Sequence, residues 1–211
     1  EFWLKESKTT DAIIVSSIEE KINLLRKGFK YKQVYTSGIP IMQETENLDK
    51  SKIFNNLKLD KNKKTILFFA GGSKGSLFNL LYFKELLKNK YDCNIVFIAG
   101  RNKMALDKAN ELVIRYNSKN VKVYGFATNL NELYYISDFV VTKPGGAQVT
   151  ECLYYKKPML LLKGNGGQEF GNRDHSTVMH AYKKIQKEVK EKNNTKLIVE
   201  SVKNIILKVE E

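Results

Sequence analysis

Glycines gather directly after the apolar, strand-like runs of this chain, and they are rare elsewhere. Two pairs stand at Gly71-Gly72 and Gly145-Gly146, and a third loop, residues 163–172, holds four more glycines. Glycine lets a backbone come close to a ligand, and free N–H groups at the start of a following helix bind anions. Several such loops predict a ligand site along one edge of a sheet, because the carboxyl ends of parallel strands meet there.

The loop at residues 71–76, GGSKGS, fits two chemistries. It lacks the G-K-[ST] ending of a Walker A loop, and it is not a G-x-G-x-x-G motif. It does match the G-x-S-x-G nucleophile elbow of α/β-hydrolases around Ser73, and Asp138 and His175 or His180 follow in the required order. In the alternative, the loop's N–H groups and the Ser73 hydroxyl contact a phosphate.

The stretch TKPGGAQVTE, residues 142–151, runs from a strand into a helix. Pro144 ends the strand, and the N–H groups of Ala147 and Gln148 should then be free donors aimed at the end of the sheet. Glu151 follows about one turn later. It could accept hydrogen bonds from ribose hydroxyls, as acidic residues do in dinucleotide sites, or it could be a solvated residue early in a helix.

The loop at residues 163–172, KGNGGQEFGN, is longer and more polar than a connection between a strand and a helix requires. Gln168, Glu169 and Asn172 can bond several hydroxyl groups at once. This combination suits the recognition of a sugar.

Short apolar runs alternate with longer amphipathic stretches along the chain. The runs are rich in β-branched and aromatic residues, as expected for strands buried on both faces. They predict strands at 12–16, 33–37, 65–70, 94–99, 121–124, 139–142 and 158–162. The stretches between them predict helices at 18–27, 77–89, 103–116, 130–136 and 147–155, with two more at roughly 170–192 and 196–208. The polar segment 42–62 predicts a loop with about one helical turn. This alternation predicts an α/β fold with a Rossmann-like, doubly wound parallel sheet.

Composition limits the classes of protein and partner. The 211 residues carry a formal charge of +13, which suits nucleotides, nucleic acid or acidic lipid headgroups as partners. No apolar run reaches the roughly 18 residues of a membrane span.

Cys93 and Cys152 lie in apolar segments without a C-x-x-C pair, which is typical of a reduced, cytoplasmic chain. The two histidines are five residues apart, so they do not share a helix face for a metal. The chain opens without Met, and we expect it to be a fragment.

Taken together, the segments resemble one family, the GT-B glycosyltransferases that include diacylglycerol glucosyltransferases, plant galactolipid synthases and the lipid II-forming N-acetylglucosaminyltransferase. The resemblance covers roughly residues 10–175. It is carried by TDAIIVSSIEEKINLLRKGF, TSGIPI, FFAGGSKG, VYGFATNLNELYYISDFVVTKPGG and TECLYYKKPMLLLKGNGGQEFGN. The last two are similar to the family patterns P-G-G-x-T-x-x-E and G-Q-E-x-x-N. The resemblance implies the C-terminal half of the GT-B fold, which binds a nucleotide sugar.

Matching positions imply a site for a UDP-sugar. The residues are Gly72, Ser73, Gly145, Gly146, Ala147 and Gln148 for the diphosphate, Phe126 and Ala127 for uracil, Glu151 for the ribose, and Gln168, Glu169 and Asn172 for the donor sugar. Gln148 stands where the family usually has Thr, and Met42 where relatives often carry Arg. Neither a metal nor another cofactor is expected, because the helix dipole and backbone donors stabilise the leaving diphosphate.

The resemblance also implies an activity. Residues 1–211 would form a single nucleotide-sugar-binding domain of an inverting glycosyltransferase, and the N-terminal acceptor domain, which holds the catalytic residues, would be absent. The whole enzyme would transfer a hexose or N-acetylhexosamine from UDP to a lipid-linked acceptor. The chain alone would bind the donor without transferring it.

The implied location is cytoplasmic, with peripheral attachment to the anionic inner face of the plasma membrane, and nucleic acid is not an expected partner. Two other classes stay open at this point. One is a serine hydrolase built on Ser73, and the other is a non-catalytic nucleotide-sugar-binding subunit.

Overall fold

A computed structural model describes residues 9–41, 47–71 and 76–162 of the chain. The chain divides into two compact units, Glu1–Met42 and Gln43–Glu211, and each is described here by itself. Two predicted helices, at 170–192 and 196–208, lie outside the described residues. That the whole chain works as one nucleotide-sugar-binding domain stays a prediction.

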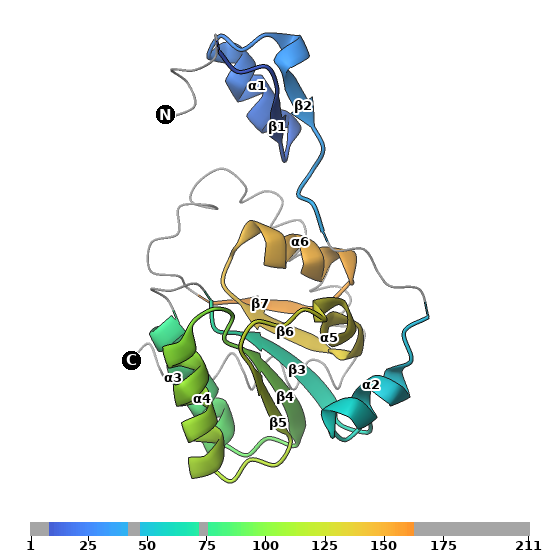
Figure 1. Cartoon of the computed structure of the whole chain (residues 1–211), viewed down its shortest axis with the longest axis vertical. Helices are drawn as coiled ribbons and strands as arrows, with labels where there is room; N and C mark the ends of the chain where they lie inside the picture. Colours follow the sequence, from blue (N-terminus) through green and yellow to red (C-terminus); the bar gives the residue numbers. More distant parts are fainter. Residues whose placement is uncertain (1–8, 42–46, 72–75, 163–211) are drawn as a thin grey trace. The chain divides into compact units, whose positions relative to one another are not determined.

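The first unit is a small βαβ element (Figure 1). Its strands, β1 (Ile13–Val15) and β2 (Val34–Thr36), pair in parallel, and α1 (Ile18–Arg26) connects them. Ser17 caps α1 by accepting a hydrogen bond from the Glu20 N–H at 3.2 Å. In return, the Glu20 carboxylate accepts hydrogen bonds from the N–H and the hydroxyl of Ser16 at 2.8 and 2.7 Å. Both predicted strands and the predicted helix of this segment are confirmed.

The second unit is built on a parallel sheet of five strands in the order β5-β4-β3-β6-β7. The strands are β3 (Lys64–Phe69), β4 (Cys93–Ile98), β5 (Val121–Tyr124), β6 (Phe139–Thr142) and β7 (Met159–Leu161). The chain moves outward from β3 to β5 and then returns to the other side of β3 to form β6. This reversal makes the sheet doubly wound, as predicted, and places its switch point between β3 and β6.

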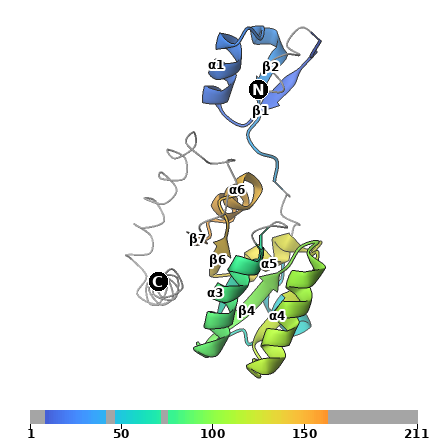
Figure 2. The same ribbon diagram turned by 90° about the vertical axis from the view of Figure 1, so that its left-hand side faces the viewer.

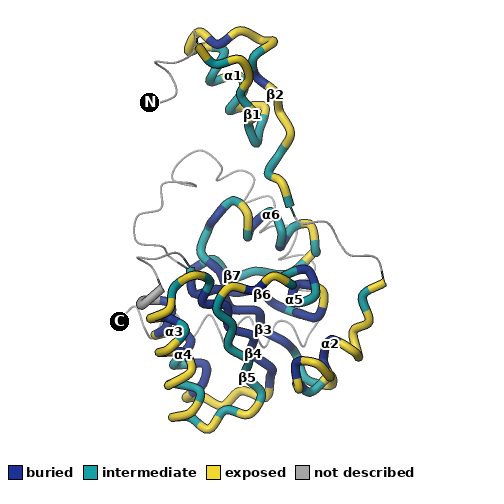
Figure 3. Tube along the Cα trace, in the orientation of Figure 1, coloured by how far each residue is buried: buried dark blue, intermediate teal, exposed yellow. Residues whose placement is uncertain are grey.

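The three central strands of the sheet, β3, β4 and β6, are buried on both faces because most of their residues are apolar (Figure 3). Successive residues of a strand point to opposite faces, so β3 sends Ile66 and Phe68 to one core and Leu67 and Phe69 to the other. Apolar side chains of α3 (Ser76–Lys88) and α4 (Lys103–Arg115) fill the first core. These two helices lie side by side on that face (Figure 2).

The opposite face is covered by α2 (Lys50–Leu57), α5 (Leu130–Ile136) and α6 (Gly146–Tyr154). The prediction of a loop with about one helical turn at 42–62 is wrong for the part that forms α2. Asp49 caps this helix by accepting hydrogen bonds from two backbone N–H groups at 2.8 and 3.1 Å. Ile53, Phe54 and Leu57 bury one side of it, and the polar residues between them obscured this face in the sequence. None of the helices within the described ranges is long and apolar enough to cross a membrane.

Candidate functional site

A cavity of about 700 Å³ opens at the carboxyl edge of the large sheet, where β3, β4, β5 and β6 end. The residues that line it come from the ends of these strands, from the loops that follow them and from the first residues of the helices after those loops. They are Phe69, Gly71, Ile98, Ala99, Gly100, Arg101, Asn102, Lys103, Phe126, Ala127, Leu130, Lys143, Gly145, Gly146, Ala147 and Gln148. The cavity therefore lies at the switch point, where open α/β sheets bind their ligands.

The N-terminus of α6 forms one wall of this cavity. Gly145 is the N-cap residue, and no side chain caps the helix. The first bond of the helix runs from the Val149 N–H to the Gly145 carbonyl at 3.0 Å. The N–H groups of Gly146, Ala147 and Gln148 therefore precede the helical ladder and carry the positive end of the helix dipole. All four predicted diphosphate residues at 145–148 line the cavity.

Gly145 has a close side-chain neighbour that the sequence did not indicate. Its φ is −96°, so its backbone does not require glycine. A Cβ atom at this position would lie 2.7 Å from Oε1 of Gln148, which means that the Gln148 amide folds back over the N-cap. Because this oxygen ends a flexible side chain that can move aside, the contact does not by itself require glycine at position 145. Its predicted role in clearance for a diphosphate stays a prediction.

Gly71, at the end of β3, does require glycine. Its φ is +87°, and a Cβ atom there would lie 3.2 Å from Nδ2 of Asn79 and 3.6 Å from Cδ of Lys143. The buried Asn79 amide donates a hydrogen bond to the Ala70 carbonyl at 2.7 Å, which ties α3 to the end of β3. The glycine is visible in the sequence, but the Asn79–Ala70 hydrogen bond is not, because this contact depends on how α3 packs against the sheet.

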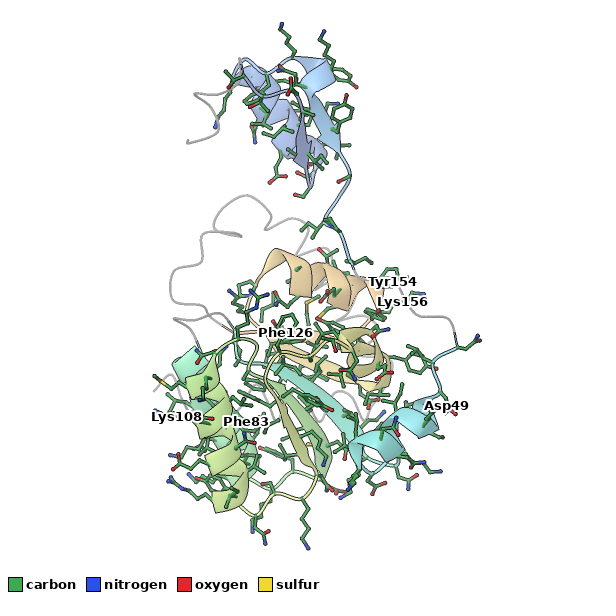
Figure 4. The ribbon with its side chains drawn as sticks, in the orientation of Figure 1. Asp49, Phe83, Lys108, Phe126, Tyr154 and Lys156 are labelled. Carbon is green, nitrogen blue, oxygen red and sulfur yellow. The ribbon has the colours of Figure 1, made fainter. Side chains whose placement is uncertain are left out.

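Phe126 and Ala127, the predicted uracil residues, follow β5 and also line the cavity. Ala127 is buried, whereas Phe126 is 65% exposed. The side chain of Phe126 is labelled in Figure 4. The guanidinium of Arg101 lies over the Phe126 ring, 5.3 Å from its centroid. An exposed aromatic ring with a cation above it is a surface on which a planar base can stack.

Three cations line the cavity, Arg101, Lys103 and Lys143, and none of its described lining residues is acidic. Arg101 and Lys103 follow the end of β4 by a few residues, and Lys143 directly follows β6. Sequence reasoning missed all three as site residues, although their position after the strands β4 and β6 was the available signal. A cavity with this charge attracts an anion.

Glu151, the predicted ribose residue, is not among the residues that line the cavity. It lies four residues after Ala147, so both are on the same side of α6, one turn apart. Its side chain is half-buried, and burial raises the pKa of the Glu151 carboxyl, while the nearby Tyr134 hydroxyl partly lowers that pKa. The other predicted residues, Gly72, Ser73, Gln168, Glu169 and Asn172, lie outside the described residues.

Glu151 gives a prediction about stability. A carboxyl whose folded pKa lies above its unfolded value keeps its proton longer in the folded protein, so the free energy of unfolding falls as pH rises through this window. Glu151→Gln removes that loss. The variant should therefore be more stable than the wild type above the raised pKa, and the gain should vanish below the ordinary Glu pKa. Urea unfolding from pH 4 to 8 measures this, and a constant difference across that range would contradict it.

Asp138, the acid proposed for a serine hydrolase, lies at the wrong edge of the sheet. Its carboxylate accepts hydrogen bonds from the Thr65 N–H and from Lys64 Nζ, both at 2.9 Å. These partners begin β3, whereas the loop that carries Ser73 leaves the other end of this strand. Asp138 therefore stabilises the amino edge of the sheet. This position does not support a catalytic triad in which Asp138 acts with Ser73 and a histidine.

A family model described as "Glycosyltransferase family 28 C-terminal domain" matches residues 66–208. Among curated proteins, the processive diacylglycerol beta-glucosyltransferase of Bacillus licheniformis is 30% identical over 194 residues, which are 89% of this chain and 50% of that protein. The chain thus spans about half the length of the curated relatives that it matches. These matches support the glycosyltransferase prediction over the serine hydrolase and the non-catalytic subunit.

Solved structures agree on the fold. A glycosyltransferase from Rickettsia africae aligns with 99% of this chain and 62% of its own, at 15% identity and a TM-score of 0.55. The Anabaena protein Alr3699/HepE, solved in complex with UDP and glucose, aligns with 80% of this chain and 48% of its own, at 16% identity and a TM-score of 0.50. The Rossmann-like architecture predicted from the sequence is confirmed.

Proposed function

This chain belongs to the glycosyltransferase family 28 C-terminal domain family, and on this basis we propose that its large unit binds the UDP-sugar donor of a glycosyl transfer reaction. The observation that carries the proposal is the cavity at the switch point. It combines the free N–H groups of α6, three cations and an exposed aromatic ring within one volume of about 700 Å³. These are the groups that a nucleoside diphosphate needs.

In this proposal each part of the donor has its own partners. The diphosphate lies over the N-terminus of α6 and beside Lys143, where the helix dipole and a cation meet its charge. Uracil lies against Phe126 and Ala127. The ribose reaches down the side of α6 towards Glu151, and the predicted sugar residues Gln168, Glu169 and Asn172 complete the site.

The proposed reaction is an inverting transfer of the sugar to a lipid hydroxyl. The charge that develops on the leaving diphosphate is stabilised by groups that are already in place at the start of α6, without a metal or another cofactor. The binding site for the acceptor and the base that deprotonates the acceptor hydroxyl would come from the part of the relatives that this chain does not span. The relatives' names, diacylglycerol beta-glucosyltransferases, favour a diacylglycerol-based acceptor and glucose as the sugar.

We also propose that the protein acts in the cytoplasm and attaches to anionic membrane surfaces, a proposal that rests on its charge of +13. Cosedimentation with vesicles of phosphatidylglycerol, compared with phosphatidylcholine, tests the attachment. Binding should be confined to the anionic vesicles and should weaken as salt rises, because salt screens exposed charges. Equal binding to both kinds of vesicle would contradict it.

The test of the donor is a thermal-shift panel of UDP, UDP-glucose, UDP-galactose and UDP-N-acetylglucosamine, with ADP and CDP as controls. A ligand at about 100 times its dissociation constant should add roughly 2.7 kcal/mol to the free energy of unfolding. The largest shift identifies the preferred sugar. If no uridine nucleotide raises the melting temperature, the proposed function is wrong.

A further inference from the structure

Tyr134 of α5 is a buried tyrosine packed against α6, close to the site but outside the residues predicted for it. Its side chain is 1% exposed. Its ring stacks on that of Tyr155, with centroids 5.2 Å apart and planes only 5° from parallel. Phe69, which lines the cavity, contacts the same ring at a centroid distance of 5.8 Å. The position of the ring is therefore fixed between α6 and the end of β3.

This stacking places Tyr134 on the side of α6 that carries Glu151. Tyr155 follows Glu151 by four residues, and its N–H donates to the Glu151 carbonyl at 2.9 Å, so the two residues share one side of the helix. The Tyr134 hydroxyl lies near the Glu151 carboxyl and the Cys152 thiol. It completes a well-formed hydrogen bond with neither of them, nor with any other described group.

A buried hydroxyl without a completed hydrogen bond is uncommon and calls for a functional or structural reason. Burial raises the pKa of Tyr134, so the hydroxyl keeps its proton and remains a donor. Burial also raises the pKa of Cys152 to about 12, so this thiol stays protonated and accepts only weakly. The Glu151 carboxylate is the better acceptor, because hydrogen bonds to charged groups are the stronger ones.

We propose that Tyr134 is a positioning residue: when the donor binds, its hydroxyl donates a hydrogen bond to Glu151 and holds the Glu151 carboxylate towards the ribose. The inference rests on the proposed function. A free Glu side chain has several rotamers, and a ligand that must order it binds less tightly. A hydroxyl that is fixed beside the carboxylate reduces this loss of affinity, because it holds one carboxylate oxygen and leaves the other for the ribose hydroxyls.

Tyr134→Phe tests the role, since it keeps the ring and its stack with Tyr155 and removes only the hydroxyl. Dissociation constants for UDP and for 2′,3′-dideoxyuridine diphosphate are measured by calorimetry on the 211-residue chain. We expect UDP to bind about 5- to 10-fold more weakly to the variant, the size of one lost hydrogen bond, and the dideoxy ligand to bind equally to both proteins. A residue with only a structural role would weaken both ligands alike.

Two further variants sharpen the test. Tyr82→Phe removes a hydroxyl from another buried tyrosine, in the core on the opposite face of the sheet, and should leave both dissociation constants unchanged. In a Glu151→Ala background, Tyr134→Phe should have no further effect on UDP. Failure of the wild type to bind UDP would overturn the proposed function and this inference with it. Normal UDP binding with no loss in Tyr134→Phe, or an equal loss for both ligands, would overturn the inference alone.

Discussion

Ala147→Asp should abolish UDP binding and leave the fold at least as stable as it was. Ala147 is the second residue of α6, is exposed and lines the cavity. A carboxylate there interacts favourably with the helix dipole, by about 0.3–1 kcal/mol. The same charge would lie where the diphosphate is proposed to bind. Two like charges about 4 Å apart repel by about 1–4 kcal/mol near a protein surface, and a diphosphate carries more than one charge.

We therefore expect a loss of UDP affinity of more than about 100-fold, which corresponds to roughly 2.7 kcal/mol. Ala147→Asn is the matched control, because it adds the same shape without the charge. Calorimetry measures binding, and urea unfolding measures stability in the same samples. If the Asp variant bound UDP within threefold of the Asn variant, the diphosphate would not lie at the start of α6.

Phe68→Ala should lower the free energy of unfolding by about 3–5 kcal/mol. Phe68 is the fifth of the six residues of β3 and has no exposed surface. Its ring contacts Phe97 of the neighbouring strand and Phe83 of α3, with centroids 5.4 and 5.9 Å away. Phe83 and Phe97 also contact each other, with centroids 4.3 Å apart, so truncation removes one of three rings that pack together and leaves a cavity that the packed sheet cannot close. A loss of this size is a large part of the stability of an ordinary domain, about 5–15 kcal/mol.

Phe126→Ala is the matched control for this change, since it truncates the same residue type at an exposed position. Its effect on stability should stay within about 0.5 kcal/mol, as for most surface substitutions. Urea unfolding of both variants, without ligand, measures the difference. Similar losses in the two variants would mean that the core is not centred on Phe68.

The fold was largely predictable because its strands are buried on both faces. An apolar run such as ILFF or NIVFI cannot lie in an exposed loop, and the helices between such runs fix a parallel connection. α2 was missed for the opposite reason. Its buried side consists of only three residues, which follow Lys52 and are interrupted by two Asn residues, so the stability of α2 depends on contacts with the rest of the folded domain.

The parts of the candidate site that are formed by backbone groups could be predicted from the sequence. The parts that are formed by side chains could not. Residues Gly145–Gln148 could be identified from the sequence alone, because two glycines there separate a strand from the start of a helix. The directions of Arg101 and Lys143 and the position of Tyr134 beside Glu151 depend on how separate segments of the chain pack together. The fold of the Gln148 amide over Gly145 is local, but it depends on a side-chain conformation that the sequence does not specify. The pattern of residues predicts where an anion binds, and tertiary packing decides which side chains surround it.

Hydrogen–deuterium exchange of the 211-residue chain, with and without saturating UDP, tests most directly whether UDP binds at the carboxyl edge of the large sheet. We predict slower exchange in peptides that cover residues 125–127 and 143–149. Residues 90–93 and 117–120, which lie in a second cavity at the opposite edge of the sheet, should exchange at the same rate in both states. Protection confined to that opposite edge, or no protection in residues 143–149, would contradict the proposed site.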